Sequence, residues 1–228
     1  MRRRSLMLGA LAASLPVAGS ADADPVVLEL FTSQGCSSCP PADALLGELE
    51  RQPAVIALAW HVDYWNGLGW HDPFATRFAT DRQRAYAARL RTEVYTPAVV
   101  VNGGAVVVGS DRAAIAQAIA RMPPPRVPIA LRAGGSGVVA SFDPALRPAT
   151  VLLASYDPVR DTAVGAGENT GRTLREYHVV RSVAVAPREA VAAGRVVFPP
   201  LAPGRGAVLL MHDASLRVIG AAALAASG

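Results

Sequence analysis

The chain has two cysteines, Cys36 and Cys39, and two residues separate them. Two thiols at this spacing can form and open a disulfide, and a position between a strand and a helix indicates redox chemistry. An apolar run over residues 26–31 precedes the pair, and Pro40 and Pro41 suit the first turn of a helix that continues to residue 50. The dipole of that helix favours a thiolate at its N-terminus. We therefore predict thiol–disulfide exchange, with Cys36 as the more exposed, attacking sulfur and Cys39 as the resolving one.

Three other interpretations of the pair stay open. Copper could bind both sulfurs together with His61, as in a metallochaperone. A structural disulfide is a second possibility, although a bridge across so short a loop would add only about 2 kcal/mol. A binding module with an inactive dithiol is the third. A closed zinc site needs four ligands, and one C-x-x-C pair supplies two.

Two further positions are predicted to be catalytic. Glu29 is the only charged residue in the apolar run before the pair, and a buried carboxyl there could exchange a proton with Cys39. A salt-bridged Glu29 is the alternative. Thr96 and Pro97 precede a β-rich run, and a cis bond is cheap only before proline. We predict a cis peptide there, with Pro97 beside Cys36 and Thr96 contacting substrate.

An aromatic insert over residues 60–73 contains all three tryptophans. Loops beyond the carboxyl ends of strands border the ligand site in open α/β sheets, so this insert is expected next to Cys36. Trp60, His61, Asp63 and Trp65 are therefore candidate substrate-binding residues. Aromatic residues that only pack the insert onto the protein are the alternative.

The order of expected elements gives a fold class. From residue 24 to 122 the patterns predict strand, helix, strand, helix, two strands joined at Asn102-Gly103-Gly104, and a final helix. This order is that of a thioredoxin-like α/β domain. Three prolines at 123–125 form a stiff linker. Residues 126–228 read almost entirely as strands, which predicts a small, sandwich-like all-β domain.

One loop of the predicted β domain stands out. Residues 165–172 are rich in glycine and polar side chains. We predict that this loop folds back towards the dithiol, where Asn169 and Arg172 would contact substrate. Arg172 could hold an acidic group of the first domain in a bidentate pair.

The N-terminal residues indicate export. Three arginines, a short apolar run and a small-residue site predict a signal peptide over residues 1–23, and hence a periplasmic or secreted protein with no stable membrane anchor after cleavage. The formal charge is +4 and every basic residue is arginine, but the arginines are scattered, which argues against nucleic acid as a partner. Exported proteins or small thiols are the expected partners, and the redox disulfide needs no cofactor unless copper binds.

Several stretches resemble a known family. Residues 29–43 around the cysteines, 60–65, 94–97 with 100–103, 167–172 and 179–181 are similar to the signature of the secreted bacterial family named domain of unknown function 1223. The resemblance covers nearly all of the chain after the signal peptide. It implies an exported, thioredoxin-like protein whose reaction is unsettled. Members more often have glutamine where this chain has Ala98, which removes one candidate substrate contact.

Overall fold

The computed structural model describes residues 25–226. The predicted signal peptide lies outside these residues. In chain order the elements are β1 (Val26–Thr32), α1 (Pro40–Leu49), β2 (Val55–His61), α2 (Arg77–Leu90), β3 (Ala98–Val101), β4 (Ala105–Val108), α3 (Arg112–Arg121), β5 (Ala130–Gly134), β6 (Gly137–Ser141), η1 (Pro144–Leu146), β7 (Thr150–Ala163), β8 (Thr173–Val185), α4 (Arg188–Ala192), β9 (Arg195–Phe198), β10 (Gly206–His212) and β11 (Val218–Leu224).

Strands from both halves of the chain join in one mixed sheet. Its eight strands run in the order β11-β10-β7-β8-β2-β1-β3-β4, and β5, β6 and β9 form a separate three-stranded sheet. The prediction of a thioredoxin-like α/β domain followed by an all-β domain is therefore wrong, although the strands and helices of the first half occur close to where the sequence predicts them. The predicted linker at residues 123–125 lies between α3 and β5, and the large sheet includes strands from both sides of it.

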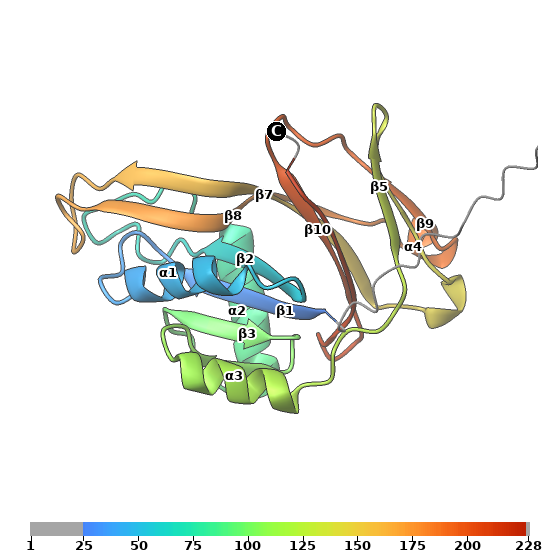
Figure 1. Ribbon diagram of the computed structural model, residues 1–228, viewed down its shortest axis with the longest axis horizontal. Helices are drawn as coiled ribbons and strands as arrows, with labels where there is room; N and C mark the ends of the chain where they lie inside the picture. Colours follow the sequence, from blue (N-terminus) through green and yellow to red (C-terminus); the bar gives the residue numbers. More distant parts are fainter. Residues whose placement is uncertain (1–24, 227–228) are drawn as a thin grey trace, which may run out of the picture.

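The join between the halves is the parallel pair β2–β8. Ala59 of β2 is in register with Val179 of β8, and the imidazole Nδ1 of His178 lies 2.9 Å from the carbonyl oxygen of Ala57. β1 pairs with β2 on its other side. An unpaired edge of β2 would expose backbone donors and acceptors, and β8 pairs with that edge at Ala59. Figure 1 shows the long β7–β8 pair running past the end of the sheet beside α1.

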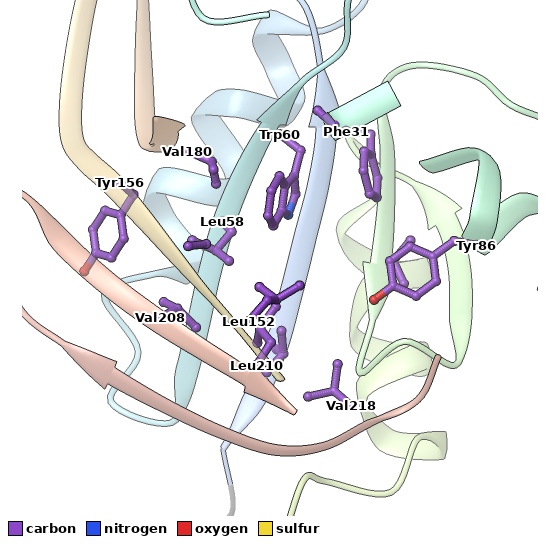
Figure 2. Packing of buried hydrophobic residues seen from close by; sticks show 14 of the residues in the cluster. Phe31, Leu58, Trp60, Tyr86, Leu152, Tyr156, Val180, Val208, Leu210 and Val218 are labelled. Atoms are coloured by element: carbon purple, nitrogen blue, oxygen red, sulfur yellow. The ribbon is translucent and has the colours of Figure 1, made fainter. Parts of the chain in front are cut away.

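One face of the large sheet encloses an apolar core together with α2. Phe31, Trp60, Tyr86, Leu152 and Leu210 belong to this core, and Figure 2 shows their side chains converging from strands of both halves and from α2. The sheet curls around the core. As a result the backbone N–H of Val218, at the start of β11, donates to the carbonyl of Asn102 in the β3–β4 turn.

The other face is covered in two parts. α1 and α3 pack on β1, β2 and β3 through a second core, which includes Leu28, Leu30, Leu46 and Ile115. The three-stranded sheet covers β7 and β10 through a third core. Within residues 25–226, no helix is both long and apolar enough to cross a membrane. The site described below lies on the α1 side, where β1 and β2 end.

Candidate functional site

Cys36 and Cys39 form a disulfide in a tight turn between β1 and α1. Their Cα atoms are 5.4 Å apart, and the N–H of Cys39 donates to the carbonyl of Cys36. Cys39 is the N-cap residue of α1. Both cysteines are 0% exposed, so the expectation that Cys36 is the more exposed of the two is wrong.

The helix end provides few donors for a thiolate. Its first two residues are prolines, which have no backbone N–H. The hydroxyl of Ser38 lies 3.3 Å from Cys36 Sγ. Because a disulfide sulfur carries no proton, this hydroxyl is the donor in the oxidised protein. The same hydroxyl would stabilise a Cys36 thiolate after reduction.

The cover loop, residues 164–172 between β7 and β8, closes over the disulfide. The side-chain amide of Asn169 donates to the carbonyls of Gln34 and Cys36, at 2.9 and 3.0 Å. The carboxylate of Glu168 accepts from the N–H of Ser37. The prediction that this loop folds back towards the cysteines is confirmed. Arg172 acts differently from the prediction, because its guanidinium donates to the side-chain oxygen of Asn169 and so fixes that amide.

The Thr96–Pro97 peptide bond is cis, as predicted. The indole N–H of Trp65 donates to the Thr96 hydroxyl at 2.8 Å, and a Cβ on Gly35 would lie 3.0 Å from the Cβ of Trp65. Trp65 therefore connects the cysteine turn to the cis bond. Pro97 lies beside the first turn of α1, since a Cβ on Gly109 would contact both Pro97 and Ala42 at 3.1 Å.

The structure does not bring Glu29 to Cys39. Side chains alternate along β1, and Glu29 points to the α2 face, away from α1. There it belongs to the Arg82 cluster, made of Glu29, Arg82, Tyr86 and His212. Arg82 donates to both carboxylate oxygens of Glu29, at 2.6 and 2.9 Å, and the Tyr86 hydroxyl donates to one of them at 2.6 Å. Although burial opposes it, the Arg82 guanidinium keeps the pKa of Glu29 below its usual value.

Trp60 is on this same α2 face and is 0% exposed, with the Arg82 guanidinium 5.2 Å from the centre of its ring. It packs the sheet and does not border the disulfide. Asp63 lies next to the start of α2, where it accepts from the Thr80 hydroxyl at 2.5 Å while its own N–H donates to the same oxygen.

Asp43 is the buried acid on the helix that begins at Cys39. It follows Cys39 by four residues on α1, one helical turn, and its N–H donates to the Cys39 carbonyl. The Thr32 hydroxyl at the end of β1 donates to Asp43 Oδ2 at 3.2 Å. Asp43 Oδ1 is buried and has no partner among the described residues. Burial raises the pKa of Asp43 to about 8, against the opposing effect of His61.

Three more ionisable residues join Asp43 in what we call the His61 cluster: His61, Asp72 and Glu176. His61 is the register partner of Thr32, and its Nδ1 lies 2.7 Å from Asp72 Oδ2. Its Nε2 lies 3.8 Å from Glu176 Oε1 on β8, and these two atoms have no hydrogen-bond partner in the described part of the chain. All four side chains are buried.

Gln34 connects this cluster to the cysteine turn. Its N–H donates to Asp72 Oδ2 at 2.9 Å, and its side-chain amide donates to Glu176 Oε2 at 2.8 Å. Its side-chain oxygen accepts from the indole of Trp70, and its carbonyl accepts from Asn169. With both backbone and both side-chain polar groups bonded, Gln34 holds the chain rigidly two residues before Cys36.

Burial and the mutual charges of the His61 cluster shift the pKa values of all four members. Burial alone would lower the pKa of His61, but Asp72 and then Glu176 and Asp43 raise it to about 9. Burial raises the pKa of Glu176 to about 7, with His61 and the Gln34 hydrogen bond opposing. Although burial opposes it, His61 keeps the pKa of Asp72 below its usual value. Three carboxyl groups share one imidazolium, so protons stay on the cluster at neutral pH.

Across residues 25–226, no three His, Cys, Asp or Glu side chains are placed to hold a metal ion. A groove of about 1140 Å³ lies between η1 and α4, and none of the residues described above lines it.

Sequence reasoning missed Gln34, Asp43, Asp72, Glu168 and Glu176. Two of them carry a readable signal. Asp43 has the i+4 spacing from Cys39, and Glu176 occupies an inward position of β8, two residues from the buried Leu174. Asp72 and Glu168 lie in loops, where no periodicity indicates direction.

Comparison with known structures supports the fold. A protein from Agrobacterium tumefaciens, whose crystal structure was solved by a structural genomics consortium, is 28% identical, with a TM-score of 0.73 over 90% of this chain and 96% of its own. HBP35 of Porphyromonas gingivalis is 15% identical, with a TM-score of 0.55 over 90% of this chain and 76% of its own, a likeness of fold alone. Comparison with curated proteins gives no match. The model of the family described as protein of unknown function DUF1223 matches residues 27–203, and the chain belongs to that family.

Proposed function

We propose that this protein carries out thiol–disulfide exchange with exported proteins or small thiols through Cys36 and Cys39. The observation that carries the proposal is the disulfide at the start of α1 with the buried carboxyl of Asp43 one helical turn behind Cys39. A disulfide that only stabilised a loop with two intervening residues would add little stability. It would also have no use for an acid whose pKa is about 8.

In the proposed reaction a substrate thiolate attacks Cys36 Sγ. The new bond joins the substrate sulfur to Cys36, and the Cys36–Cys39 bond breaks, so that Cys39 leaves with the electron pair. Neutral Asp43 gives its proton to the Cys39 thiolate. A second substrate thiolate then displaces Cys36, which yields oxidised substrate and the reduced dithiol. Reversing these steps oxidises the dithiol, with the Asp43 carboxylate taking the Cys39 proton.

Substrate must reach a buried sulfur in this scheme. Asn169 and Glu168 bind the cover loop to the backbone of Cys36 and Ser37. Because both sulfur atoms are buried, we propose that this loop moves before the first attack. Its contacts with the cysteine turn are few hydrogen bonds, worth about 1 kcal/mol each. Such a loop can open without unfolding the sheet.

Single-cysteine variants test the proposal. Reduced Cys39→Ser should accumulate a mixed disulfide with oxidised glutathione, and reduced Cys36→Ser should trap almost none, because only Cys36 has the Ser38 donor. Mass spectrometry of the intact protein measures both. Equal trapping by the two variants, or a disulfide that no dithiol reduces in the folded protein, would end the proposal.

The copper alternative is tested in the same variants. A site made of Cys36, Cys39 and His61 predicts that each serine variant loses copper affinity to a similar extent and that neither traps glutathione. In the structure His61 faces Asp72 and Glu176, and we do not propose a copper site.

A further inference from the structure

Glu176 comes from the second half of the chain, yet it lies in the group of charges that surrounds Asp43. It is 1% exposed, and one carboxylate oxygen is fixed by Gln34 while the other faces His61 Nε2. A buried carboxyl with an unpartnered oxygen costs stability, and a protein that retains such a group often uses it for function. Its position suggests that this use is connected with the proton on Asp43.

We infer that Glu176 and His61 are positioning residues of opposite sign, and that the balance between them sets the pH up to which Asp43 keeps the proton that Cys39 needs when the disulfide opens. The inference rests on the proposed exchange reaction. Glu176 acts by the negative charge it adds near Asp43 and His61 by the positive charge it adds. Neither residue touches the substrate or the sulfur atoms in this scheme.

Groups from the loop after β2 and from β1, β7 and β8 surround the His61 cluster. Asp72 holds His61 from the aromatic insert, and Thr32 donates to Asp43 from β1. Phe74 packs edge-on against His61 at 5.4 Å, with the Arg181 guanidinium on that ring at 4.6 Å. Asp161 on β7 acts on Glu176, but it is half-exposed and near Arg175, so solvent weakens its effect. The charged groups that determine the pH at which Asp43 loses its proton are therefore His61, Glu176 and Asp72.

Two substitutions should move the same property in opposite directions. Glu176→Gln keeps an oxygen for the Gln34 amide but cannot become negative, so Asp43 should lose its proton at lower pH. His61→Gln removes the positive charge, so Asp43 should keep its proton to higher pH. A packing role predicts lower stability for both variants and no opposite shifts.

The experiment measures the rate at which a dithiol with an acidic thiol reduces the full-length protein between pH 5 and pH 10. Such a reagent is already a thiolate across the upper range, so the alkaline decline in rate reports the Asp43 proton. We expect that decline to move down by at least one pH unit in Glu176→Gln and up by a similar amount in His61→Gln. Asp161→Asn is the matched carboxylate control and should leave the decline in place.

A second measurement distinguishes failure of this inference from failure of the proposed function. In the oxidised protein, NMR of the imidazole nitrogens should show that Glu176→Gln lowers the pH at which His61 loses its proton. An unchanged His61 titration, or pH declines that do not move in opposite directions, would overturn the inference while exchange by the unmodified protein stands. If one variant does not fold, the direction in which the alkaline decline moves in the other variant still tests the inference. No reduction of the unmodified protein at any pH would instead overturn the proposed function.

Discussion

Two buried ionic clusters lie on opposite faces of the large sheet, and they differ in how their charges are balanced. In the Arg82 cluster one carboxylate meets one guanidinium in a bidentate pair, with Tyr86 as a further donor. In the His61 cluster three carboxyl groups share one imidazole, and three of the polar atoms have no partner among the described residues. The balanced cluster joins β1, α2 and β10. The unbalanced one lies behind the disulfide and holds protons.

The largest expected effect concerns the balanced cluster. Arg82→Met leaves Glu29 buried without its cation, and we expect a loss of about 3–5 kcal/mol in the free energy of unfolding. Arg84→Met on the same helix is the control, because Arg84 is half-exposed and its removal should cost less than about 1 kcal/mol. Denaturant unfolding measures both. Equal losses would mean that the Arg82 cluster does not hold the sheet to α2.

The unbalanced cluster should respond in the opposite way. Folded Asp43 keeps its proton to about pH 8, whereas an unfolded aspartate loses it near pH 4. The folded protein therefore binds more protons between these values, and its stability falls as the pH rises. Asp43→Asn removes the contribution of Asp43, which costs the unmodified protein about 1.4 kcal/mol per pH unit and hence about 3 kcal/mol between pH 6 and pH 8.

The same chemical denaturation, repeated at several pH values, provides the test. The slope of stability with pH should flatten in Asp43→Asn and stay steep in Asp81→Asn, a control at an exposed position of α2. An unchanged slope in Asp43→Asn would show that Asp43 is ionised at neutral pH.

Most secondary structure can be predicted from local patterns, but neither the pairing of β8 with β2 nor the two clusters can. The apolar runs at β1 and β2 and the N-cap Asp111 of α3 are read directly. Glu29 illustrates the difficulty: a lone acid in an apolar strand must have a partner, and the sequence does not say whether that partner is Cys39 or Arg82, 53 residues away. Partners so distant are set by the three-dimensional packing of the sheet.

An effect of intermediate size is expected when the cover loop is loosened. Asn169→Ala removes two hydrogen bonds that hold the loop on the cysteine turn. We expect dithiothreitol to reduce the disulfide about tenfold faster, with a loss of about 1–3 kcal/mol in stability. Thr170→Ala, which removes only a bond within the loop, should change the rate little. Reduction no faster in Asn169→Ala would mean that the loop does not limit access.

The smallest effect is expected at Ser38. Without its hydroxyl the reduced Cys36 thiolate loses a donor, so alkylation of reduced Ser38→Ala by iodoacetamide at pH 7 should be about two- to threefold slower. Ser37→Ala is the neighbouring control. If both variants react at the rate of the unmodified protein, Ser38 does not stabilise the thiolate.

The parallel pair β2–β8 also bears on how the protein reaches its folded state. Asn169 and Glu176 meet the cysteine turn across 133 and 142 residues of sequence. Contacts between residues so far apart in the sequence form late, because closing a long loop costs entropy before the contacts can stabilise the chain. During synthesis the two cysteines therefore emerge well before the residues that bury them. In that interval the thiols are open to oxidants, and the mature surroundings of the disulfide form only when β8 joins the sheet.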